Sequence, residues 1–422
     1  MTLTERDKKV IWHPYTQAKN AMPVIGITSA SGPYLFAEDG NRYIDAVSSW
    51  WVNIHGHSHP YIAEKVAAQL SNLEHVIFAG FTHEPAVLLA ERLLPVLPGT
   101  QDKVFYSDNG STAVEVALKM CIQFWSNSGV PERKRVLAFK DSYHGDTFGA
   151  MSVSARSIFT DAFASYLFEV EFIDLPTDEN IADLRQLIAS QADNLACFIF
   201  EPLVLGSGGM LMYRAELLDQ LLELCRDKGV LLIADEVMTG FGRTGVPFAT
   251  AGLHNKPDIF CLSKGLTGGT MALGITTCTD KIFEGFYSDD KLKTLYHGHS
   301  FTANPIACTA ALASLDLFLG EETQANLDRI TRRHANFSAK ISGHPRLKDI
   351  RQTGTILALE WETGTDTSYL SGLRDRMYKW FLDRGILMRP LGNIIYLMPP
   401  YVISDEDLDY IYKQIEIALA EI

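Results

Sequence analysis

Short apolar runs recur through the middle of the chain, and segments with helical spacing of hydrophobic residues separate them. Several runs are apolar at every position, which is typical of strands in a sheet that is covered on both faces. This alternation of strand and helix predicts an α/β fold with a mainly parallel central sheet flanked by helices. The predicted strands are KVFYS (103–107), RVLAF (135–139), ACFIF (196–200), VLLIA (230–234), DIFCL (258–262) and LGITTC (273–278).

Two helices are predicted in the same region. Residues 112–125 carry apolar side chains three and four positions apart, which places them on one face of a helix. Residues 215–228 repeat this amphipathic pattern and are followed by Gly229, a residue type that often ends helices.

The pattern changes after about residue 320 and predicts a smaller α+β domain. A polar helix (324–341) precedes TILALEWE (355–362), which alternates as a strand does, and a last helix follows Ser404, where Asp407 completes a predicted capping box. The expected division is an N-terminal segment over 1–48 that packs with the small domain, a large domain over 49–320, and the small domain over 321–422.

Composition narrows the class of protein. The chain has 422 residues, enough for more than one core, and its net charge of −14 argues against binding of nucleic acid. No apolar run reaches the ~18 residues that a membrane span needs, so no membrane partner is expected. The six cysteines are scattered, mostly within apolar runs, which indicates reduced thiols and a cytoplasmic protein.

Three segments place candidate chemistry at the ends of predicted elements. Asp235 ends a buried strand, at the sheet edge where open α/β folds bind ligands. Lys264 follows the strand at 258–262 and precedes a glycine-rich turn. Gly110, Ser111 and Thr112 begin a helix, where free N–H groups favour a phosphate.

Each segment alone has an ordinary interpretation, since a lysine after a strand usually lies on the surface and a polar helix start is usually a plain cap. Together they provide what pyridoxal phosphate requires. The helix start would take the phosphate, Asp235 would keep the pyridine nitrogen protonated, and Lys264 would form the Schiff base. An aromatic residue should lie against the cofactor ring, and Tyr143 in KDSYHGDTFGAMS (140–152) is the candidate.

Two other motifs are rejected. Gly240, Gly242 and Gly245 form a literal G-x-G-x-x-G, but a polar loop follows them where a dinucleotide fingerprint should open a helix. The histidines at 55, 57 and 59 would share a face on an extended segment and could then converge on a metal. Glycine and proline within residues 48–60 make a regular strand doubtful and the stretch contains no acidic or cysteine ligand, so we predict no metal site and expect the histidines to hydrogen-bond within the loop.

The chain resembles the class III aminotransferases of pyridoxal-phosphate fold type I nearly from end to end. The pieces ADEV, SKG and GFGRTG are general to that class. The pieces WHPYT, SSWW, YHGDTFGAMS and YLMPPY are more specific to the branch that aminates 8-amino-7-oxononanoate in biotin synthesis. Further segments that carry the likeness are DNGSTAVEVALKM (108–120), EPLVLGSGGM (201–210), HGHSFTANPIAC (297–308) and LMRPLGNIIYLMPPY (387–401).

The resemblance implies how the cofactor would be held. Lys264 would bind it covalently and then move a proton between carbon atoms, while Asp235 would pair with the pyridinium nitrogen. Val237 and Tyr143 would pack on the two faces of the ring. The phosphate would lie against Gly110 and Ser111.

The resemblance also implies a homodimer with its active site at the subunit interface. Ser300 of the partner, beside His299, would join the phosphate site, and Gly298 would lie at the edge of the substrate pocket. The synthases of this branch carry Pro-Thr where this chain has His-Ser, and serine keeps the hydroxyl that the role needs. A second departure is Met238, where many class III members have glutamine near the phenolic oxygen of the cofactor; it loosens the match to ornithine- and aminobutyrate-type enzymes.

Substrate contacts are implied as well. Tyr15, Trp50 and Tyr143 would line the substrate pocket, with Tyr15 also among the catalytic residues. Arg389 would pair with the carboxylate of the keto acid, a task that suits guanidinium. The implied activity is transfer of the amino group of S-adenosylmethionine to 8-amino-7-oxononanoate. A class III ω-aminotransferase with another donor, such as lysine, or another keto acid remains an alternative, as does a non-catalytic binding protein with this fold.

Overall fold

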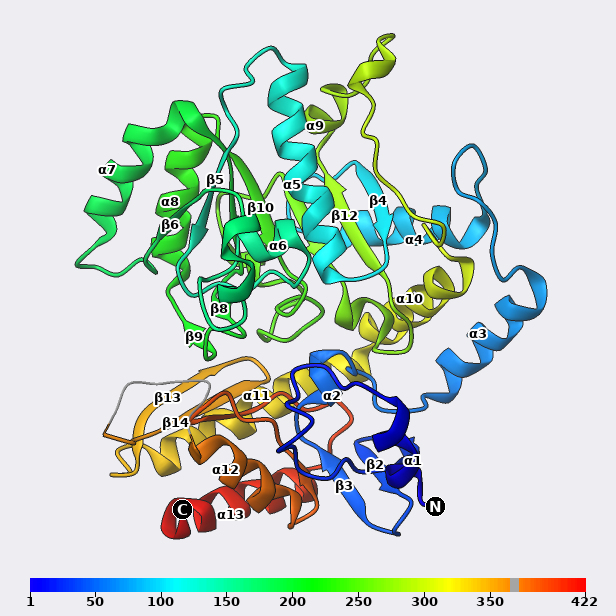
Figure 1. Ribbon diagram of the computed structural model, residues 1–422, viewed down its shortest axis with the longest axis vertical. Coiled ribbons are helices and arrows are strands. Elements are labelled where there is room, and N and C mark those ends of the chain that lie inside the picture. The colour runs from blue at the N-terminus through cyan, green and yellow to red at the C-terminus, as the bar shows by residue number, and fades with distance from the viewer. Residues whose placement is uncertain (365–371) are drawn as a thin grey trace.

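A seven-stranded sheet forms the centre of the upper lobe of the computed structural model, which describes residues 1–364 and 372–422 (Figure 1). Parallel pairing joins β6, β5, β7, β10 and β11 in that spatial order, as the apolar runs predict. The exception is β12, which runs antiparallel to both of its neighbours, β11 and β4. The strands are β4 (Lys103–Ser107), β5 (Arg135–Phe139), β6 (Val170–Ile173), β7 (Leu195–Phe200), β10 (Leu231–Asp235), β11 (Ile259–Leu262) and β12 (Gly274–Cys278).

Six of these strands were predicted, with bounds that agree within one residue. The strand that was missed, β6, is short and lies at the edge of the sheet, next to β5 alone. Its sequence, VEFI, places a charged residue among apolar ones, as edge strands often do. It therefore lacks the continuous apolar run by which the buried strands were recognised.

Both faces of the sheet are covered, which explains those continuous runs. Val136 and Ile233 pack with α5 (Gly110–Asn127) on one face. Leu137 and Leu232 point to the other face and join the core that includes α8 (Ala215–Asp227). The two helices that the sequence predicts in this region are thus confirmed.

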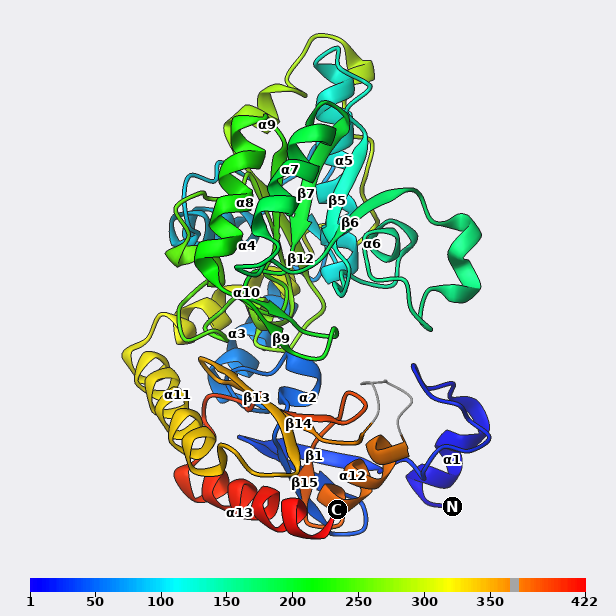
Figure 2. The ribbon, with the colours of Figure 1, turned by 90° about the vertical axis from the view of Figure 1, so that its left-hand side faces the viewer.

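The lower lobe is built from both ends of the chain, and both termini lie in it (Figures 1 and 2). Its four-stranded sheet has the order β1-β2-β3-β15, in which β15 (Ile386–Leu387) pairs in parallel with β3 (Arg42–Asp45). A second sheet has the order β13-β14-β16. The N-terminal strands therefore share a sheet with the C-terminal part, while the domain boundaries themselves stay a prediction. The remaining strands are β1 (Ile27–Ser31), β2 (Tyr34–Ala37), β8 (Val204–Leu205), β9 (Leu211–Met212), β13 (Leu347–Thr353), β14 (Ile356–Trp361) and β16 (Ile394–Leu397).

Three details of the lower lobe bear on the predictions. TILALEWE forms the predicted strand, β14, which is buried at every position because β13 and β16 flank it and α11 packs on it. The first helix, α1, was not predicted at all. At the last helix, Ser404 does cap the N–H of Asp407, but the Asp407 carboxylate accepts from the hydroxyls of Ser404 and Tyr34, so the reciprocal half of the predicted capping box is wrong.

The other helices complete the two lobes. They are α1 (Leu3–Val10), α2 (Ser48–Trp51), α3 (Pro60–Asn72), α4 (Glu84–Leu93), α6 (Phe148–Ser152), α7 (Ile181–Gln191), α9 (Asp280–Glu284), α10 (Pro305–Phe318), α11 (Glu321–Ile341), α12 (Gly372–Leu382) and α13 (Asp405–Glu421). Short 3-10 turns are η1 (Leu94–Val96), η2 (Asp161–Tyr166), η3 (Ala192–Asn194), η4 (Ala249–Gly252), η5 (Lys264–Thr267) and η6 (Lys291–Lys293). Within the described part of the chain, no helix is both long and apolar enough to cross a membrane.

The glycine motif after β10 folds as a series of turns and opens no helix. Gly242 and Gly245 adopt φ values of 94° and 87°, a region that glycine reaches without a steric penalty. The rejection of a dinucleotide-binding fingerprint therefore agrees with the structure.

Candidate active site

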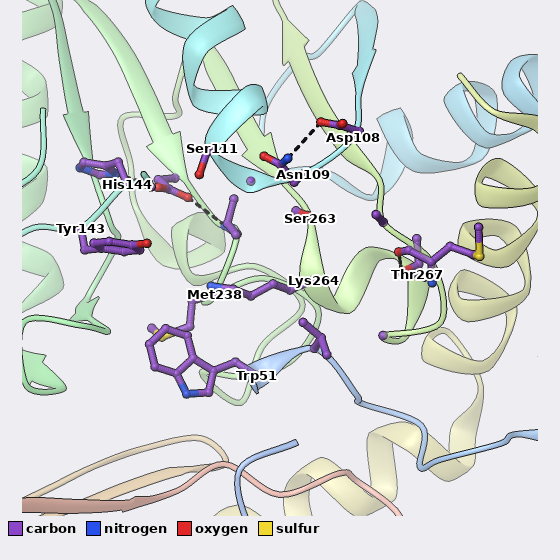
Figure 3. Close-up of a pocket in the computed structure, with 18 of the residues that line it drawn as sticks. Trp51, Asp108, Asn109, Ser111, Tyr143, His144, Met238, Ser263, Lys264 and Thr267 are labelled. Carbon is purple, nitrogen blue, oxygen red and sulfur yellow. Dashed lines mark hydrogen bonds and ion pairs between the residues drawn. The ribbon is translucent and has the colours of Figure 1, made fainter. Parts of the chain in front are cut away.

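A cavity of about 420 Å³ lies where strands of the large sheet meet the lower lobe (Figure 3). Residues that follow β5, β7, β10 and β11 line it, together with the start of α5. Parallel strands present their carboxyl ends at one edge, and ligands of open α/β sheets bind there. The cavity thus lies where the strand-end residues of the sequence were expected to meet.

Lys264 is half-buried at the first position of η5, and its side chain runs above the Trp51 ring, with Nζ 4.6 Å from the ring centroid (Figure 3). Burial lowers the pKa of Lys264 to about 8, although the charges of Asp235 and Glu201 act in the opposite direction. A lysine in this state supplies a neutral, nucleophilic amine near neutral pH. Its backbone has a φ of 47°, a left-handed conformation that is costly outside glycine and is often found at functional sites.

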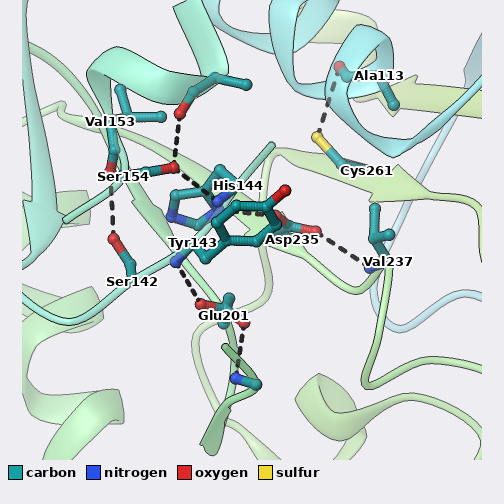
Figure 4. A network of polar contacts seen from close by, with 12 residues as sticks. Ala113, Ser142, Tyr143, His144, Val153, Ser154, Glu201, Asp235, Val237 and Cys261 are labelled. Atoms are coloured by element: carbon teal, nitrogen blue, oxygen red, sulfur yellow. Dashed lines mark hydrogen bonds and ion pairs between the residues drawn. The ribbon is translucent and has the colours of Figure 1, made fainter. Parts of the chain in front are cut away.

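Asp235 ends β10 and is buried beside His144 (Figure 4). Its Oδ2 lies 2.7 Å from Nδ1 of His144, and its Oδ1 accepts the N–H of Val237 at 3.1 Å. The histidine and the backbone N–H both stabilise a negative charge on Asp235. That charge is what a protonated pyridine nitrogen requires.

The start of α5 forms a cradle for an anion. The side chain of Asn109 caps the helix by accepting the N–H of Thr112. Gly110 and Ser111, the first two residues of the helix, line the cavity. A Cβ on Gly110 would come within 2.8 Å of Val237, so the backbone can approach this closely only without a side chain. The first N–H groups of a helix have no partner within it and attract phosphate.

These features fit pyridoxal phosphate. A lysine, a carboxylate and an anion cradle surround one cavity, in the arrangement that the cofactor needs. Gly145 also fits this site. A Cβ at this position would lie 2.1 Å from Oγ of Ser111, so only a glycine leaves space for the serine hydroxyl at the start of α5.

A second cluster brings together the predicted substrate residues from distant parts of the chain. The hydroxyls of Tyr15 and Tyr143 are 3.1 Å apart, and the Tyr15 ring centroid lies 5.5 Å from that of Trp50. The Arg389 guanidinium stacks over Trp50 at 4.2 Å. Tyr143 also borders a neighbouring cavity of about 410 Å³, which includes Phe159 in its lining, so it stands between the two spaces.

Gly298, His299 and Ser300 lie apart from these clusters. They belong to the segment between η6 and α10, and none of them lines either cavity of the same chain. Gly298 and Ser300 are exposed. Their predicted roles toward a partner subunit stay predictions.

Sequence reasoning missed several residues of the cofactor cavity, among them Trp51, His144 and Glu201. Trp51 is only 4% exposed and its Nε1 donates to the Tyr396 hydroxyl at 2.9 Å, whereas Trp50 is 38% exposed. Two adjacent tryptophans give no sign of which one faces a cavity. His144 had a usable signal, since it follows Tyr143 just beyond a predicted strand.

The alternating histidines point to different partners. Nε2 of His55 lies 3.0 Å from the Ser314 hydroxyl, and Nε2 of His57 lies 2.9 Å from Oδ2 of Asp45. These contacts confirm the predicted loop hydrogen bonds for His55 and His57, whereas Nδ1 of His59 is buried without a hydrogen-bond partner in the described part of the chain. Across the residues that the structure describes, no group of three or more histidine, cysteine or acidic side chains could hold a metal.

Comparisons with known proteins agree with this geometry. The family model for class-III aminotransferases matches residues 15–419. A protein of Synechococcus elongatus named adenosylmethionine-8-amino-7-oxononanoate aminotransferase is 47% identical, over 98% of this chain and 99% of its own length. A protein of Geobacter sulfurreducens with the same name is 38% identical, over 98% of this chain and 96% of its own.

Solved structures show the same likeness. The crystal structure of adenosylmethionine-8-amino-7-oxononanoate aminotransferase from Methanocaldococcus jannaschii superposes with a TM-score of 0.94 at 36% identity, covering 99% of this chain and 98% of that one. An omega transaminase from Pseudomonas jessenii, in complex with PMP, superposes with a TM-score of 0.94 at 26% identity, covering 100% and 98%. The resemblance found in the sequence and the fold class that it implies are confirmed: this chain belongs to the class III aminotransferases, beside the adenosylmethionine-8-amino-7-oxononanoate aminotransferases.

Proposed function

We propose that this chain transfers the amino group of S-adenosylmethionine to 8-amino-7-oxononanoate, by way of pyridoxal phosphate, and so forms 7,8-diaminononanoate in biotin synthesis. The observation that supports it most is that Lys264 lies in one cavity with Asp235, which is paired with His144. The relatives that share the name of this reaction align over nearly the whole chain.

When bound, pyridoxal phosphate supplies an electron sink that lets an amino group leave one substrate and join another. Lys264 provides the neutral amine that holds the cofactor and then the Nζ that carries a proton during transfer. Asp235, held by His144, keeps a negative charge against the pyridine nitrogen. The start of α5 would hold the phosphate of the cofactor.

The outer cluster suits both substrates. The rings of Trp50 and Tyr15 offer a flat apolar wall for the chain of the keto acid, and their faces attract the positive sulfonium of the donor. Arg389 lies against that wall and can form two parallel hydrogen bonds to a carboxylate.

Trp50→Ala is expected to raise the KM for 8-amino-7-oxononanoate about fivefold, because losing an aromatic contact in a partly exposed site costs on the order of 1 kcal/mol. The cofactor should stay bound, since Trp50 does not line its cavity. Steady-state kinetics and the cofactor's visible absorbance measure both effects. Trp50→Phe keeps a ring in place and should recover most of the affinity. Unchanged kinetics in the alanine variant would remove Trp50 from the substrate wall.

We also propose a cytoplasmic homodimer in which each site takes Ser300 and His299 from the partner subunit. Support comes from their position outside the cavities of their own chain and from exposed apolar side chains nearby, such as Tyr296 and Phe301. The six cysteines are free and buried, in keeping with a reducing compartment.

Hybrid dimers test the shared site. Chains that carry Lys264→Ala or Ser300→Asp should each be nearly inactive, because one lacks the amine and the other places a negative charge at the phosphate. After unfolding and refolding together, mixed dimers contain one site with both defects and one with neither, so about a quarter of the wild-type activity should return when subunits pair at random. If activity does not return in mixtures that sedimentation shows to be dimeric, Ser300 does not act across the interface.

The reaction itself is tested by product analysis. The purified enzyme, loaded with pyridoxal phosphate, is incubated with S-adenosylmethionine and 8-amino-7-oxononanoate, and mass spectrometry should detect 7,8-diaminononanoate. The alternatives predict other outcomes. A different ω-aminotransferase would form the product only with another donor or would aminate another keto acid, and a binding protein would purify without cofactor colour.

A further inference from the structure

Glu201 is a buried carboxyl in the cavity that the reaction outlined above does not use. It follows β7 directly and is 5% exposed. Its Oε1 accepts the N–H of Tyr143 at 2.9 Å, and its Oε2 accepts the N–H of Gly206 at 3.0 Å (Figure 4). One side chain thus joins two segments that are far apart in the sequence.

The Tyr143 segment forms one wall of the cavity, and the Gly206 segment supports another from behind. Tyr143 lines it directly and reaches the substrate cluster through Tyr15. Gly206 backs onto two other lining residues, because a Cβ there would lie 2.5 Å from Sδ of Met238 and 3.2 Å from the Trp51 ring. A change in the bonding of Glu201 would therefore reach both walls.

Glu201 also lies beside the carboxylate that pairs with His144. Strands β7 and β10 are parallel with Phe200 opposite Ala234, so the next residues, Glu201 and Asp235, end neighbouring strands. Two buried carboxyls this close do not both ionise readily. Asp235 has the imidazole of His144 at 2.7 Å, whereas the two oxygens of Glu201 accept neutral backbone N–H groups.

The surroundings of Glu201 bring its ionisation into the neutral pH range. The pKa of Glu201 is raised to about 7, mainly by burial and in part by the charge of Asp235, while His144 and the two N–H groups act against the rise. The charged group from η5 is Lys264, whose own pKa the charge of Glu201 raises. Tyr213 faces the backbone instead, donating its hydroxyl to the carbonyl oxygen of Glu201 at 2.6 Å.

We propose that Glu201 is a positioning residue of this active site: it ties the Tyr143 and Gly206 walls together and, by binding or releasing one proton, sets the negative charge that Lys264 experiences. This deepens the proposed function and rests on it. The proton is exchanged with solvent through the cavity and takes no part in bond making. Above neutral pH, Glu201 is ionised and its negative charge stabilises the protonated Nζ of Lys264. Below neutral pH, Glu201 is neutral and this stabilisation is lost.

The test is a pH titration of the visible absorbance of the holoenzyme, which reports the proton on Nζ of Lys264. Glu201→Gln keeps the shape but removes the charge, so the midpoint should move to lower pH by about one unit, the size of effect that one nearby opposite charge produces. Glu201→Asp keeps a charge and should titrate near the wild-type midpoint, although the shorter side chain loosens Tyr143. A midpoint that stays in place in Glu201→Gln would reduce Glu201 to a structural role and overturn the proposal.

Asp258→Asn is the matched control. Asp258 is also buried and also accepts a backbone N–H, from Leu232 at 2.9 Å, but it lies at the other end of the sheet, just before β11. Its replacement should leave the midpoint unchanged. An equal shift in both variants would show a general loss of packing and would likewise overturn the proposal.

A second measurement applies if Glu201→Gln does not take up cofactor. Infrared spectra of the cofactor-free wild-type protein, with labelled glutamate, should show a glutamic acid signal that ionises near pH 7. That signal should disappear in Glu201→Asp; if it persists there, the titrating acid is not Glu201. Neither measurement contains S-adenosylmethionine or a keto acid, so failure of the proposed substrates and failure of this role are distinguishable.

Discussion

Lys264→Ala is expected to abolish turnover, with kcat falling by about 10³-fold or more, as when the central nucleophile of an enzyme is removed. The reason is that Lys264 is the single lysine among the described residues that line the cavity with Asp235. The visible absorbance of bound cofactor should change at the same time, because the covalent attachment is lost. Activity assays and absorption spectra of the purified variant measure both effects.

A control separates this loss from misfolding. Lys379→Ala removes an exposed lysine that pairs with Asp383 on α12, far from the cavity, and should leave kcat unchanged. Both variants should unfold within a few degrees of the wild-type Tm. Turnover by Lys264→Ala within tenfold of wild type would show that the amine is not needed.

The same residue predicts a pH dependence. Burial holds the pKa of Lys264 at about 8, below the ordinary 10.5, so the neutral amine gains population as pH rises through 8. Uptake of pyridoxal phosphate by the cofactor-free protein should therefore be faster at pH 9 than at pH 7. Stopped-flow absorbance measures this rate.

Asp235→Asn is expected to lower kcat by about 10²-fold or more, the effect of removing one electrostatic partner of a reacting group. The amide keeps the size of the side chain but supplies no charge to a pyridine nitrogen, and His144 loses the carboxylate at 2.7 Å. Cofactor should still bind, because Lys264 and the start of α5 are unchanged. The measurements are kcat and the amount of bound cofactor.

Asp258→Asn again provides the control. It removes a buried carboxylate that does not line the cavity. It should keep wild-type kcat. Full activity in Asp235→Asn would mean that the pyridine nitrogen needs no anionic partner here, and the assignment of Asp235 would be wrong.

Much of the inner site was predictable because it depends on strand ends. An apolar run that stops at a charged residue marks a sheet edge, and parallel strands bring such residues together, so Asp235 and Lys264 were expected to be neighbours. The start of α5 was visible for the same reason, as a polar turn between a strand and a helical pattern. The antiparallel direction of β12 could not be predicted, because the residues of a buried strand do not indicate in which direction it runs.

The walls of the site were harder to predict because their backbone is irregular. Ser48, Ser49 and Trp51 have φ values of 51°, 60° and 67°, and no periodic pattern survives such a segment. This turn directs the Trp51 ring toward Lys264 and the Trp50 ring toward Tyr15. Glu201 was not predicted for another reason. Its contacts are with the backbone N–H groups of Tyr143 and Gly206, which reach it only in the folded chain.

The most direct test of the central claim is a single half-reaction with each donor. The holoenzyme is mixed with S-adenosylmethionine or with lysine, in the absence of any keto acid, and the visible absorbance is followed to completion. We expect S-adenosylmethionine to convert the bound cofactor fully to its aminated form, and lysine to leave the spectrum unchanged. Conversion by lysine with none by S-adenosylmethionine would contradict the proposed donor.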